Sequence, residues 1–469
     1  MEYDAARYRL VNPRNAIALA AAALALAVTA FAPQVLNDGD TYLHIAAGQR
    51  MLADGAILFA DPFSYTRAGA PWDAHEWLSE ILMAAVYRAG GWSGLVLLFA
   101  GAAAAAVFVL SRALGRRLDP AAQIAVTVLA MACMSGSLLV RPHLLALSLL
   151  ALWTAMLVKA RDEDRAPPMA LAALMVIWVN IHASFLLGFA IAGGLALEAV
   201  LARRASGRGW VVFLAAAFGA ALINPHFVDG LLFPLRLMAV PALAHVGEWQ
   251  ATPFSILQPV VPVTAAALYV IVTRRVRIPL VRAAMLIVLA YLAFTHVRHQ
   301  MVFAIVAPLL LAAPLGAALG AAPQSSPRWR TVSAAALCAG AILIAVRLVL
   351  PIARGDAPVA PISALAHVPQ SLRGAPVLND YAFGGYLIFA GVKPFIDSRA
   401  ELYGEAGLER YAALIRPGPL TDAMRRYDIR WSILAPSSPI ARELAREGWK
   451  QIYADRFAVV QIRDNAQQR

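Results

Sequence analysis

The chain has 469 residues, of which 61% are hydrophobic and only 14% are charged, and its mean hydropathy is +0.65. A soluble domain carries about 25% charged residues, so this composition excludes an ordinary soluble protein and indicates one that is solvated by lipid. The formal net charge of +12 could suggest nucleic-acid binding. The basic residues, however, form short clusters between apolar runs, which is the positive-inside pattern of a polytopic membrane protein.

The first apolar run follows Arg14 and extends from residue 16 to residue 32. A cleaved signal peptide is one interpretation, because Ala30-Phe31-Ala32 resembles a small-residue cleavage site. The run is long for a signal peptide and Pro33 follows it directly, so we favour an uncleaved first span.

A spanning helix needs about 20 predominantly apolar residues, and about eleven segments meet or approach this length. The predicted spans are 15–33, 92–111, 120–140, 143–160, 168–182, 184–202, 210–226, 254–273, 278–295, 300–320 and 331–350. The fifth and sixth are short. We expect there either a tight hairpin broken at Asn180-Ile181-His182 or two partly inserted helices.

The basic clusters predict the orientation of the chain. They fall at 112–117, 159–165, 203–208, 274–277 and 328–330. With a cytoplasmic N-terminus, every one of them lies on the cytoplasmic side. The sequence therefore predicts a mainly α, multi-pass protein of a bacterial-type inner membrane. We expect a transmembrane domain over 1–351 with an acidic first outer loop at 34–80, and an extracytoplasmic domain over 352–469.

The first outer loop is longer than a simple turn, and loops of this length are usually functional. It is rich in carboxylates and histidines in a chain that otherwise avoids charge. Helical periodicity predicts amphipathic helices over 41–54 and 75–88, separated by a loop over 55–74. Such helices are expected to lie in the plane of the membrane interface.

After about residue 351 short apolar strands alternate with charged helices, which predicts a small α/β domain. The expected strands are 376–379, 394–397, 431–435, 450–454 and 457–462, and the expected helices are 405–415, 421–427 and 440–447. The last two strands should form a hairpin. Asp397 and Arg399 follow the second strand, where sites often form. They could be a local ion pair, or a group that faces the acceptor or belongs to a lid.

All nine histidines are predicted on or near the outer side. Four polar pairs stand at the ends of predicted spans: Arg141 and His143, Asn180 and His182, Asn224 and His226, and Arg298 and His299. Such groups near a membrane are costly and usually face a cavity or a partner, although each could simply cap a helix end. With His44, Asp73, His75 and Glu76 of the first loop, they form the predicted substrate- and phosphate-binding set.

Asp38-Gly39-Asp40 is the sharpest motif candidate. Two acids two residues apart could share a divalent cation such as Mg²⁺ or Mn²⁺, or one of them could act as a base. The same three residues could also be an ordinary helix entry with Asp40 as the N-cap.

The layout resembles the GT-C class of membrane glycosyltransferases, which use polyprenyl-phosphate-linked sugars. The stretch DTYLHIAAGQRMLADGAILFADPFSYT with PWDAHEWL is similar to the first loop of the RgtA/B/C/D-like and protein-mannosyltransferase-like members. NDYAFGGYLIF and FIDSRAELYG are similar to the outer domains of some of them. The WWDYG segment of oligosaccharyltransferases is not reproduced, because both of its tryptophans are missing.

This resemblance implies that the chain transfers a hexose or pentose from a polyprenyl phosphate to an acceptor outside the membrane. Asp40 matches the first-loop catalytic base by position, with Asp38 as its neighbour. Cationic side chains would then stabilise the departing phosphate. Arg141, Arg298 and His299 are expected at the right depth for this role.

Two other classes of function stay open. A transporter or lipid flippase would carry ionisable residues near mid-membrane and inverted repeats, and the sequence shows neither. A non-catalytic envelope assembly protein would instead bind partners through its C-terminal domain.

Overall fold

A computed structural model describes residues 13–203, 206–241, 247–320 and 329–463. The chain folds into two compact units. Unit 1 comprises Met1–Val35, Trp92–Pro234 and Ala244–Pro351, and unit 2 comprises Leu36–Gly91, Leu235–Leu243 and Ile352–Arg469. One division between the two units falls between residues 351 and 352, and most of the first loop belongs to unit 2 together with the C-terminal residues. The predicted transmembrane and extracytoplasmic domains stay a prediction. The predicted outer-side His245 lies outside the described residues.

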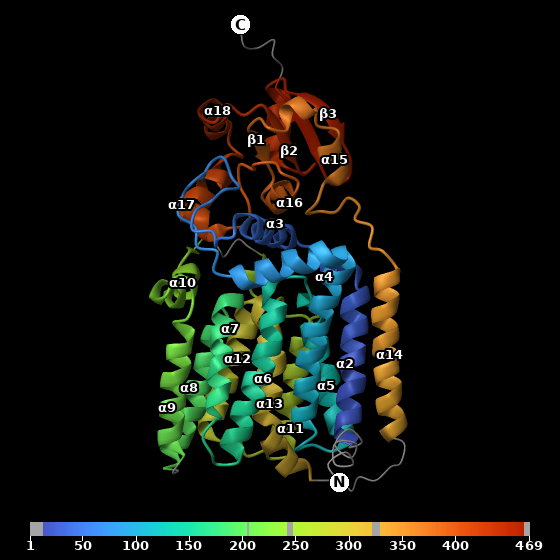
Figure 1. The fold of residues 1–469 in the computed structure, drawn as a ribbon, viewed down its shortest axis with the longest axis vertical. Helices are drawn as coiled ribbons and strands as arrows, with labels where there is room; N and C mark the ends of the chain where they lie inside the picture. The colour runs from blue at the N-terminus through green and yellow to red at the C-terminus, as the bar shows by residue number, and fades with distance from the viewer. Residues whose placement is uncertain (1–12, 204–205, 242–246, 321–328, 464–469) are drawn as a thin grey trace. The chain divides into compact units, whose positions relative to one another are not determined.

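Unit 1 is a bundle of apolar helices that run roughly parallel to one another (Figure 1). Its helices are α2 (Pro13–Phe31), the later part of α4 (Trp77–Leu114), α5 (Pro120–Met134), α6 (Pro142–Asp162), α7 (Leu174–Ile181), α8 (Phe185–Leu201), α9 (Gly207–Ala221), α11 (Val260–Thr273), α12 (Leu280–Thr295), α13 (Gln300–Leu319) and α14 (Trp329–Val349); α10 (Val228–Met238) crosses into unit 2. Among the described residues, six helices are long and apolar enough to span a membrane, and five more are apolar but shorter. They correspond to the eleven predicted spans.

The break between the fifth and sixth predicted spans falls where the sequence places it. The 3-10 turn η3 (Met169–Ala173) leads into α7, which ends at Ile181. His182 then adopts an extended backbone, with φ −166° and ψ 144°, before α8 begins at Phe185. The core beside this break is aromatic, and Trp153 donates from Nε1 to the Gly188 carbonyl at 2.9 Å.

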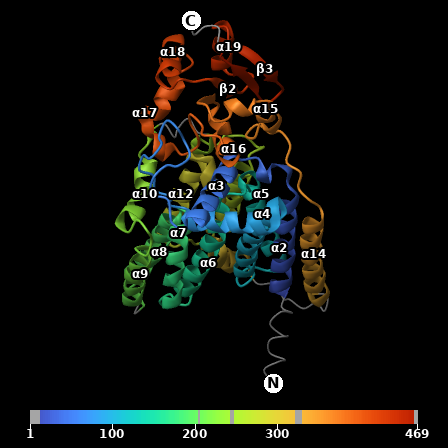
Figure 2. The same cartoon turned by 45° about the horizontal axis from the view of Figure 1, so that its top comes forward.

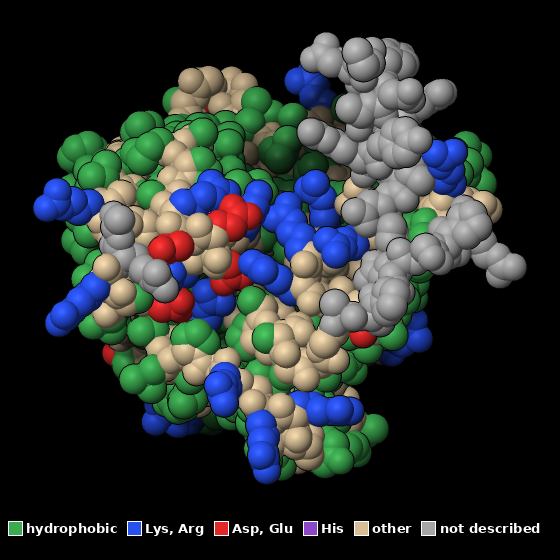
Figure 3. Space-filling view, turned by 90° about the horizontal axis from the view of Figure 1, so that it is seen from below, with side chains coloured by type: hydrophobic (Ala, Val, Ile, Leu, Met, Phe, Trp, Pro, Cys, Tyr) green, Lys and Arg blue, Asp and Glu red, His purple; other side chains and the backbone are tan. Residues whose placement is uncertain are grey.

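Unit 1 also contains a buried network of charges at helix ends. Arg282, near the start of α12, contacts Asp162 at 2.7 Å and Glu198 at 2.9 Å, and it is only 3% exposed. Asp162 is the last residue of α6, and Glu198 lies in the last turn of α8. On the face seen in Figure 3, acidic side chains lie among lysines and arginines. Paired charges at helix ends tie these three helices together without placing an ion in the apolar middle of the bundle.

Unit 2 combines helices with a four-stranded sheet (Figure 2). Its helices are α3 (Gly39–Asp54), the start of α4, α15 (Ile362–Ala366), α16 (Gly384–Phe389), α17 (Ala400–Ala413), α18 (Pro417–Arg426) and α19 (Pro439–Arg446). Its strands are β1 (Val377–Asn379), β2 (Trp431–Leu434), β3 (Lys450–Ala454) and β4 (Val459–Ile462). The sheet order is β1-β2-β4-β3, with β1 parallel to β2 and the other pairs antiparallel. The predicted hairpin of the last two strands is confirmed.

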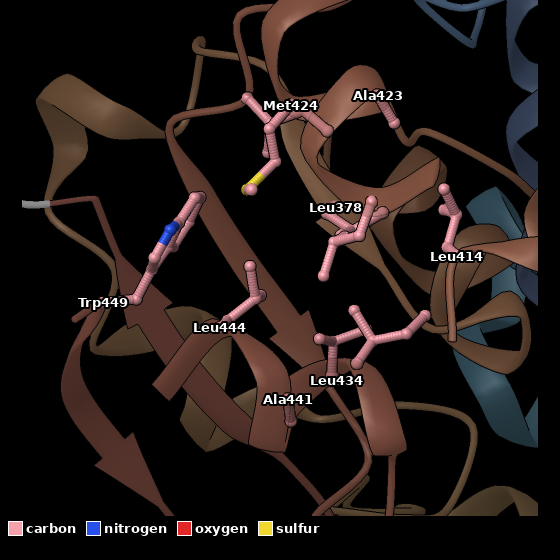
Figure 4. Close-up of a cluster of buried hydrophobic side chains, with 11 residues drawn as sticks. Leu378, Leu414, Ala423, Met424, Leu434, Ala441, Leu444 and Trp449 are labelled. Carbon is pink, nitrogen blue, oxygen red and sulfur yellow. The ribbon is translucent and has the colours of Figure 1, made fainter. Parts of the chain in front are cut away.

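The sheet and its helices enclose an apolar core (Figure 4). Leu378 of β1, Leu434 of β2 and Leu444 of α19 are fully buried in it, and Trp449 closes one end. The spacing of Ile440, Ala441 and Leu444 on α19 gives that helix the apolar stripe which the core covers.

The predicted strand at 394–397 is wrong, because this segment forms no strand. Its backbone is satisfied by side chains instead of by a neighbouring strand. The Asn379 amide oxygen accepts from the Phe395 N–H at 2.7 Å, and its nitrogen donates to the Ile396 carbonyl at 2.8 Å. Thr66 donates from its hydroxyl to the Phe395 carbonyl at 2.6 Å.

The predicted helix at 41–54 is α3, but it is buried within unit 2 and does not lie on a surface as predicted. Every residue from 41 to 48 is buried. Both α16 and the start of α4 approach it closely. The predicted helix at 75–88 is the beginning of α4, which bends at Gly91, where φ is 56° and ψ is −150°.

Candidate functional site

The Asp38-Gly39-Asp40 motif forms the start of α3. Asp38, and not Asp40, is the N-cap, and its Oδ1 accepts from the Asp40 N–H at 2.8 Å. Asp40 lies in the first turn and is partly exposed. The unpaired N–H groups and the dipole of a helix favour a carboxylate at this end. The motif therefore fixes one acid as a cap and presents the other near the surface of unit 2.

Gly39 lets α3 approach α16 closely. A Cβ on Gly385 would lie 2.2 Å from the Gly39 carbonyl oxygen, and one on Gly39 would lie 3.0 Å from the Ala382 carbonyl oxygen. The glycines of the NDGD and AFGGY segments thus pack against each other, and at residue 385 only glycine gives the backbones room to meet. This contact between α3 and α16 explains why both motifs contain glycine.

His44 lies one turn after Asp40 and is 8% exposed. Its Nδ1 is 3.0 Å from Glu80 Oε1, and its Nε2 is 3.5 Å from Glu76 Oε2. A Cβ on Gly48, a further turn along, would lie 1.9 Å from the Glu80 carbonyl oxygen. The helix can therefore lie directly on the start of α4 only because residue 48 is glycine. That contact brings Glu80 to His44.

Burial alone would lower the pKa of His44. The hydrogen bond to Glu80 and the charges of Glu76, Glu80 and Asp40 outweigh it and raise the pKa to about 9. The imidazole of His44 is therefore a cation at neutral pH. For His75, burial likewise opposes the hydrogen bond and charge of Glu76, which raise the pKa of His75.

This raised pKa predicts a pH dependence of stability. The pKa of His44 is 6.5 in the unfolded chain and about 9 when folded, so its stabilisation is complete below pH 6.5 and is lost as the pH rises toward 9. The full effect is on the order of 3 kcal/mol. Thermal unfolding of detergent-solubilised protein should show the midpoint falling across this window, and the fall should be much smaller in His44→Gln. An equal fall in both proteins would contradict the prediction.

Arg141 and Arg298 gather around Glu248 in unit 1. Arg141 Nη1 is 3.2 Å from Glu248 Oε1, and the guanidinium of Arg298 lies 4.4 Å from the centre of the Trp249 ring. Burial opposes ionisation of Glu248, but the charges of Arg141 and Arg298 lower its pKa to about 2. The group is therefore two guanidinium cations around one carboxylate, with net positive charge for an anionic ligand.

Four described histidines of unit 1, His143, His182, His296 and His299, lie in two pairs beside this group. The His143 ring lies 6.4 Å from that of His182, and His143 Nε2 is 3.0 Å from the Ser137 carbonyl oxygen. The His296 ring lies 5.4 Å from His299 and 5.9 Å from Trp249. The structure thus brings together Arg141, His143, Arg298 and His299, which the sequence singles out from separate spans.

Asn180, Asn224 and His226 make contacts typical of helix ends. Asn180 donates to the Val176 and Ile223 carbonyls at 2.7 and 2.9 Å. Asn224 accepts from the His226 N–H at 2.9 Å. These contacts match the capping interpretation, while a role in binding stays a prediction.

Asp397 and Arg399 form part of a buried network. Arg399 Nη2 contacts Asp397 Oδ2 at 2.7 Å, and its Nη1 contacts Asp61 Oδ1 at 2.8 Å. The Arg399 side chain is 3% exposed, and both carboxylates are fully buried. Its guanidinium also lies 4.5 Å from the centre of the Trp72 ring. This arrangement joins the first loop to the C-terminal part of unit 2 and favours the ion-pair interpretation over a lid or an acceptor-facing group.

The described residues contain no group of three or more His, Cys, Asp or Glu side chains that could hold a metal ion. Asp38 uses one carboxylate oxygen to cap α3. A cation shared by the two acids of the motif stays a prediction.

Sequence reasoning missed the site roles of Glu248 and Trp249. They stand between two predicted spans, and an isolated Glu-Trp pair in that apolar context is the signal that could have indicated them. Glu80 is one of the first-loop acids, but nothing local indicates that it contacts His44 across 36 residues of chain.

No family model and no curated protein matches the sequence. Several solved structures match it, and two of them cover most of its length. The first is ArnT from Cupriavidus metallidurans bound to undecaprenyl phosphate. It is 13% identical, covers 96% of this chain and 97% of its own, and gives a TM-score of 0.52. The second is the apo oligosaccharyltransferase from Archaeoglobus fulgidus. It is 11% identical, covers 89% of this chain and 69% of its own, and gives a TM-score of 0.51. Both are GT-C glycosyltransferases. The chain is therefore a multi-pass membrane protein with the GT-C fold, as predicted.

Proposed function

We propose that this chain is a membrane glycosyltransferase that moves a sugar from a polyprenyl-phosphate donor to an acceptor at the outer face of a bacterial-type inner membrane. The observation that carries the proposal is the likeness, over nearly the full length of both chains, to an ArnT bound to undecaprenyl phosphate. The acidic helix entry at Asp40 and the cationic group around Arg141 supply the two kinds of side chain that this chemistry needs.

Asp40 is proposed as the general base. It would take the proton from the acceptor hydroxyl as the acceptor oxygen forms its bond to the anomeric carbon of the sugar. The bond between that carbon and the donor phosphate oxygen breaks, and its electron pair leaves with the polyprenyl phosphate. The first turn of a helix suits this role, because the base must stay ionised until the acceptor arrives.

Arg141 and Arg298 are proposed to bind the donor phosphate. Guanidinium groups bind phosphate oxygens in a bidentate manner, and they stabilise the negative charge that grows on the leaving group. Glu248 would hold the two arginines in place before the donor binds. A membrane-embedded donor would bring its phosphate to headgroup level, where arginines at helix ends are well suited to receive it.

Replacing Arg141 with Gln should lower kcat/KM for the donor by roughly 10- to 100-fold, since a hydrogen bond to a charged group contributes about 1.5–3 kcal/mol. Arg141→Lys should recover part of this loss, because it keeps the charge but not the bidentate geometry. The control is Arg208→Gln, an exposed arginine at the start of α9, which should behave like the native enzyme. Steady-state kinetics at varied donor concentration would measure kcat/KM for each variant. Equal effects of the two Gln variants would contradict the phosphate-binding role of Arg141.

A divalent cation shared by Asp38, Asp40 and the donor remains a separate proposal, and the mechanism above contains no step that depends on it. Transfer measured with and without EDTA tests it. Loss of activity that Mg²⁺ or Mn²⁺ restores would support a metal requirement.

The direct test is a transfer assay in liposomes with a panel of polyprenyl-phosphate-linked hexoses and pentoses. Release of polyprenyl phosphate that depends on the protein, together with labelled acceptor, would support the proposal. Movement of the lipid-linked sugar across the bilayer without release would favour a flippase. A flippase is disfavoured by the charges of unit 1, because Asp162, Glu198 and Arg282 are paired at helix ends.

A further inference from the structure

Four arginines of unit 1 lie where three segments of the chain meet at one end of the helix bundle. Arg14 is in the first turn of α2, and Arg112 is in the last turn of α4. Arg116 and Arg117 follow in the short loop before α5. Together these four residues are the arginine cluster, and the transfer mechanism above does not use them.

A buried glutamine holds two of these segments against each other. Gln123 of α5 is 1% exposed, and its Nε2 donates to the Ser111 carbonyl at 3.0 Å and to the Arg14 carbonyl at 3.1 Å. Ser111 directly precedes Arg112 in α4. The backbone that carries Arg14 is therefore fixed next to the backbone that carries Arg112.

The loop between α4 and α5 is packed just as closely. A Cβ on Gly115 would lie 2.6 Å from Gln123 Oε1, and a Cβ on Gly316 of α13 would lie 2.2 Å from the Arg117 carbonyl oxygen. Only glycine at residue 316 lets α13 lie this close to the loop. The arginine cluster therefore stands on a preorganised backbone.

The cluster holds like charges together with little compensation. The pKa of Arg116 is lowered by partial burial and by the charges of the other three arginines, while Glu163 acts in the opposite direction. Glu163 is itself paired with Arg165 at 2.7 Å. Arg117 contacts Asp162 at 3.2 Å, but that carboxylate also compensates an arginine of α12 at 2.7 Å. Repulsion among like charges destabilises a fold, so this arrangement indicates a site that an anion completes.

The cluster lies at the opposite end of α6 from the proposed donor site. Arg117 contacts Asp162, the last residue of α6, whereas Arg141 directly precedes the first. Helix α6 has 21 residues and is therefore about 30 Å long, which is the thickness of the hydrocarbon core of a bilayer. The cluster thus belongs to the other leaflet, the one predicted to face the cytoplasm, and it is separate from the donor phosphate.

An apolar surface of α5 adjoins the cluster. Ile124 directly follows Gln123, and Val128 stands one turn further along the helix. Their side chains are 47% and 50% exposed. A phosphate held by the arginines would have these apolar side chains beside it, at the depth where an acyl chain enters the hydrocarbon. A soluble anion would make no use of this surface, which favours a lipid as the ligand.

We propose that the arginine cluster binds the phosphate of an anionic phospholipid of the phosphatidylglycerol class, with an acyl chain along Ile124 and Val128. Guanidinium groups bind phosphate oxygens in a bidentate manner, and basic pockets between transmembrane helices bind such headgroups. The bound phosphate relieves the repulsion among the arginines and so stabilises unit 1. This inference goes beyond the proposed function and does not depend on sugar transfer.

The test is binding of phosphatidylglycerol to the full-length protein in detergent, measured by native mass spectrometry and by thermal unfolding. Phosphatidylcholine of the same chain length is the zwitterionic comparison. The native protein should bind phosphatidylglycerol more tightly, and only this lipid should raise its unfolding midpoint. Arg112→Gln/Arg116→Gln should lose about 25-fold in affinity, because each arginine near an anionic lipid contributes about fivefold.

The matched control is Arg274→Gln/Arg275→Gln. These two arginines are also exposed and also stand at the end of an apolar helix, α11, and their loss changes the net charge by the same amount. This variant should bind phosphatidylglycerol like the native protein. Equal losses in the two double variants would indicate a generally basic surface and overturn the inference. An equal rise of the midpoint with inorganic phosphate would overturn the choice of a lipid.

The unfolding midpoint without lipid separates lost binding from lost folding. Arg112 and Arg116 are exposed, and neither forms an ion pair with an acid that the structure describes. Without lipid, Arg112→Gln/Arg116→Gln should therefore unfold at the native temperature or above it, because repulsion is removed. A lower midpoint would show that these arginines stabilise the fold without an anion, and it would overturn the inference.

Discussion

Asp40→Asn is expected to lower kcat for sugar transfer by about 10²- to 10⁴-fold, the usual contribution of a general base. The substitution removes the only group on α3 that is proposed to take the acceptor proton, and it leaves the shape of the side chain unchanged. The cap of α3 should survive, because Asp38 accepts from the backbone N–H of residue 40 and not from its side chain. Loss of the first-turn charge should cost no more than about 1 kcal/mol of stability.

Two other acids of the same helix serve as controls for this prediction. Asp38→Asn keeps an acceptor oxygen for the cap and should retain most of the activity if Asp38 is only a cap. Asp54→Asn removes an exposed acid at the far end of α3, where it pairs with Arg50 at 2.6 Å, and it should be indistinguishable from the native enzyme. Transfer rates are measured in liposomes at equal protein content, with thermal unfolding as a check on folding. Undiminished transfer by Asp40→Asn would remove the central assignment.

The helical part of the fold could be predicted because its signals are local. The length of each apolar run and the placement of arginines at run ends are both read within about 20 residues. The chain break at His182 and the start of α3 at the Asp38 motif are local in the same way. Such signals do not depend on the position of any other part of the chain.

The contacts that build the site are long-range, and this is why the sequence predicts them less well. Arg399 meets Asp61 across 338 residues, and Arg141 meets Glu248 across 107. The wrong strand at 394–397 has the same cause. Its short apolar run, Phe395-Ile396, is typical of a strand, but the side chain of Asn379 satisfies the backbone that a neighbouring strand would otherwise pair. Propensity yields to tertiary hydrogen bonding at such positions.

Arg399→Met is expected to destabilise unit 2 by about 3–5 kcal/mol, the typical cost of removing one partner from a buried ion pair. Methionine fills much of the volume of arginine, so the loss is mainly electrostatic. It leaves Asp61 and Asp397 as carboxylates that are 2% and 0% exposed and lack their cation. The remaining donors are neutral: the Ser64 hydroxyl and the backbone N–H groups of residues 63 and 64 for Asp61, and the Tyr403 hydroxyl and the backbone N–H of residue 399 for Asp397. They supply no compensating positive charge.

The chain supplies a matched control for Arg399→Met. Asp428 and Arg430 have the same spacing as Asp397 and Arg399 in the same unit and contact each other at 2.7 Å, but they are 59% and 34% exposed. Arg430→Met should cost at most about 1 kcal/mol, because water screens an exposed pair. Chemical unfolding of the two variants measures what removal of the arginine costs in a buried and in an exposed pair of the same Asp-x-Arg spacing. The triple variant Asp61→Asn/Asp397→Asn/Arg399→Met should regain part of the stability lost in Arg399→Met, because no unpaired charge then remains buried. If Arg399→Met were as stable as Arg430→Met, the network would not be what joins the first loop to the C-terminal part of unit 2.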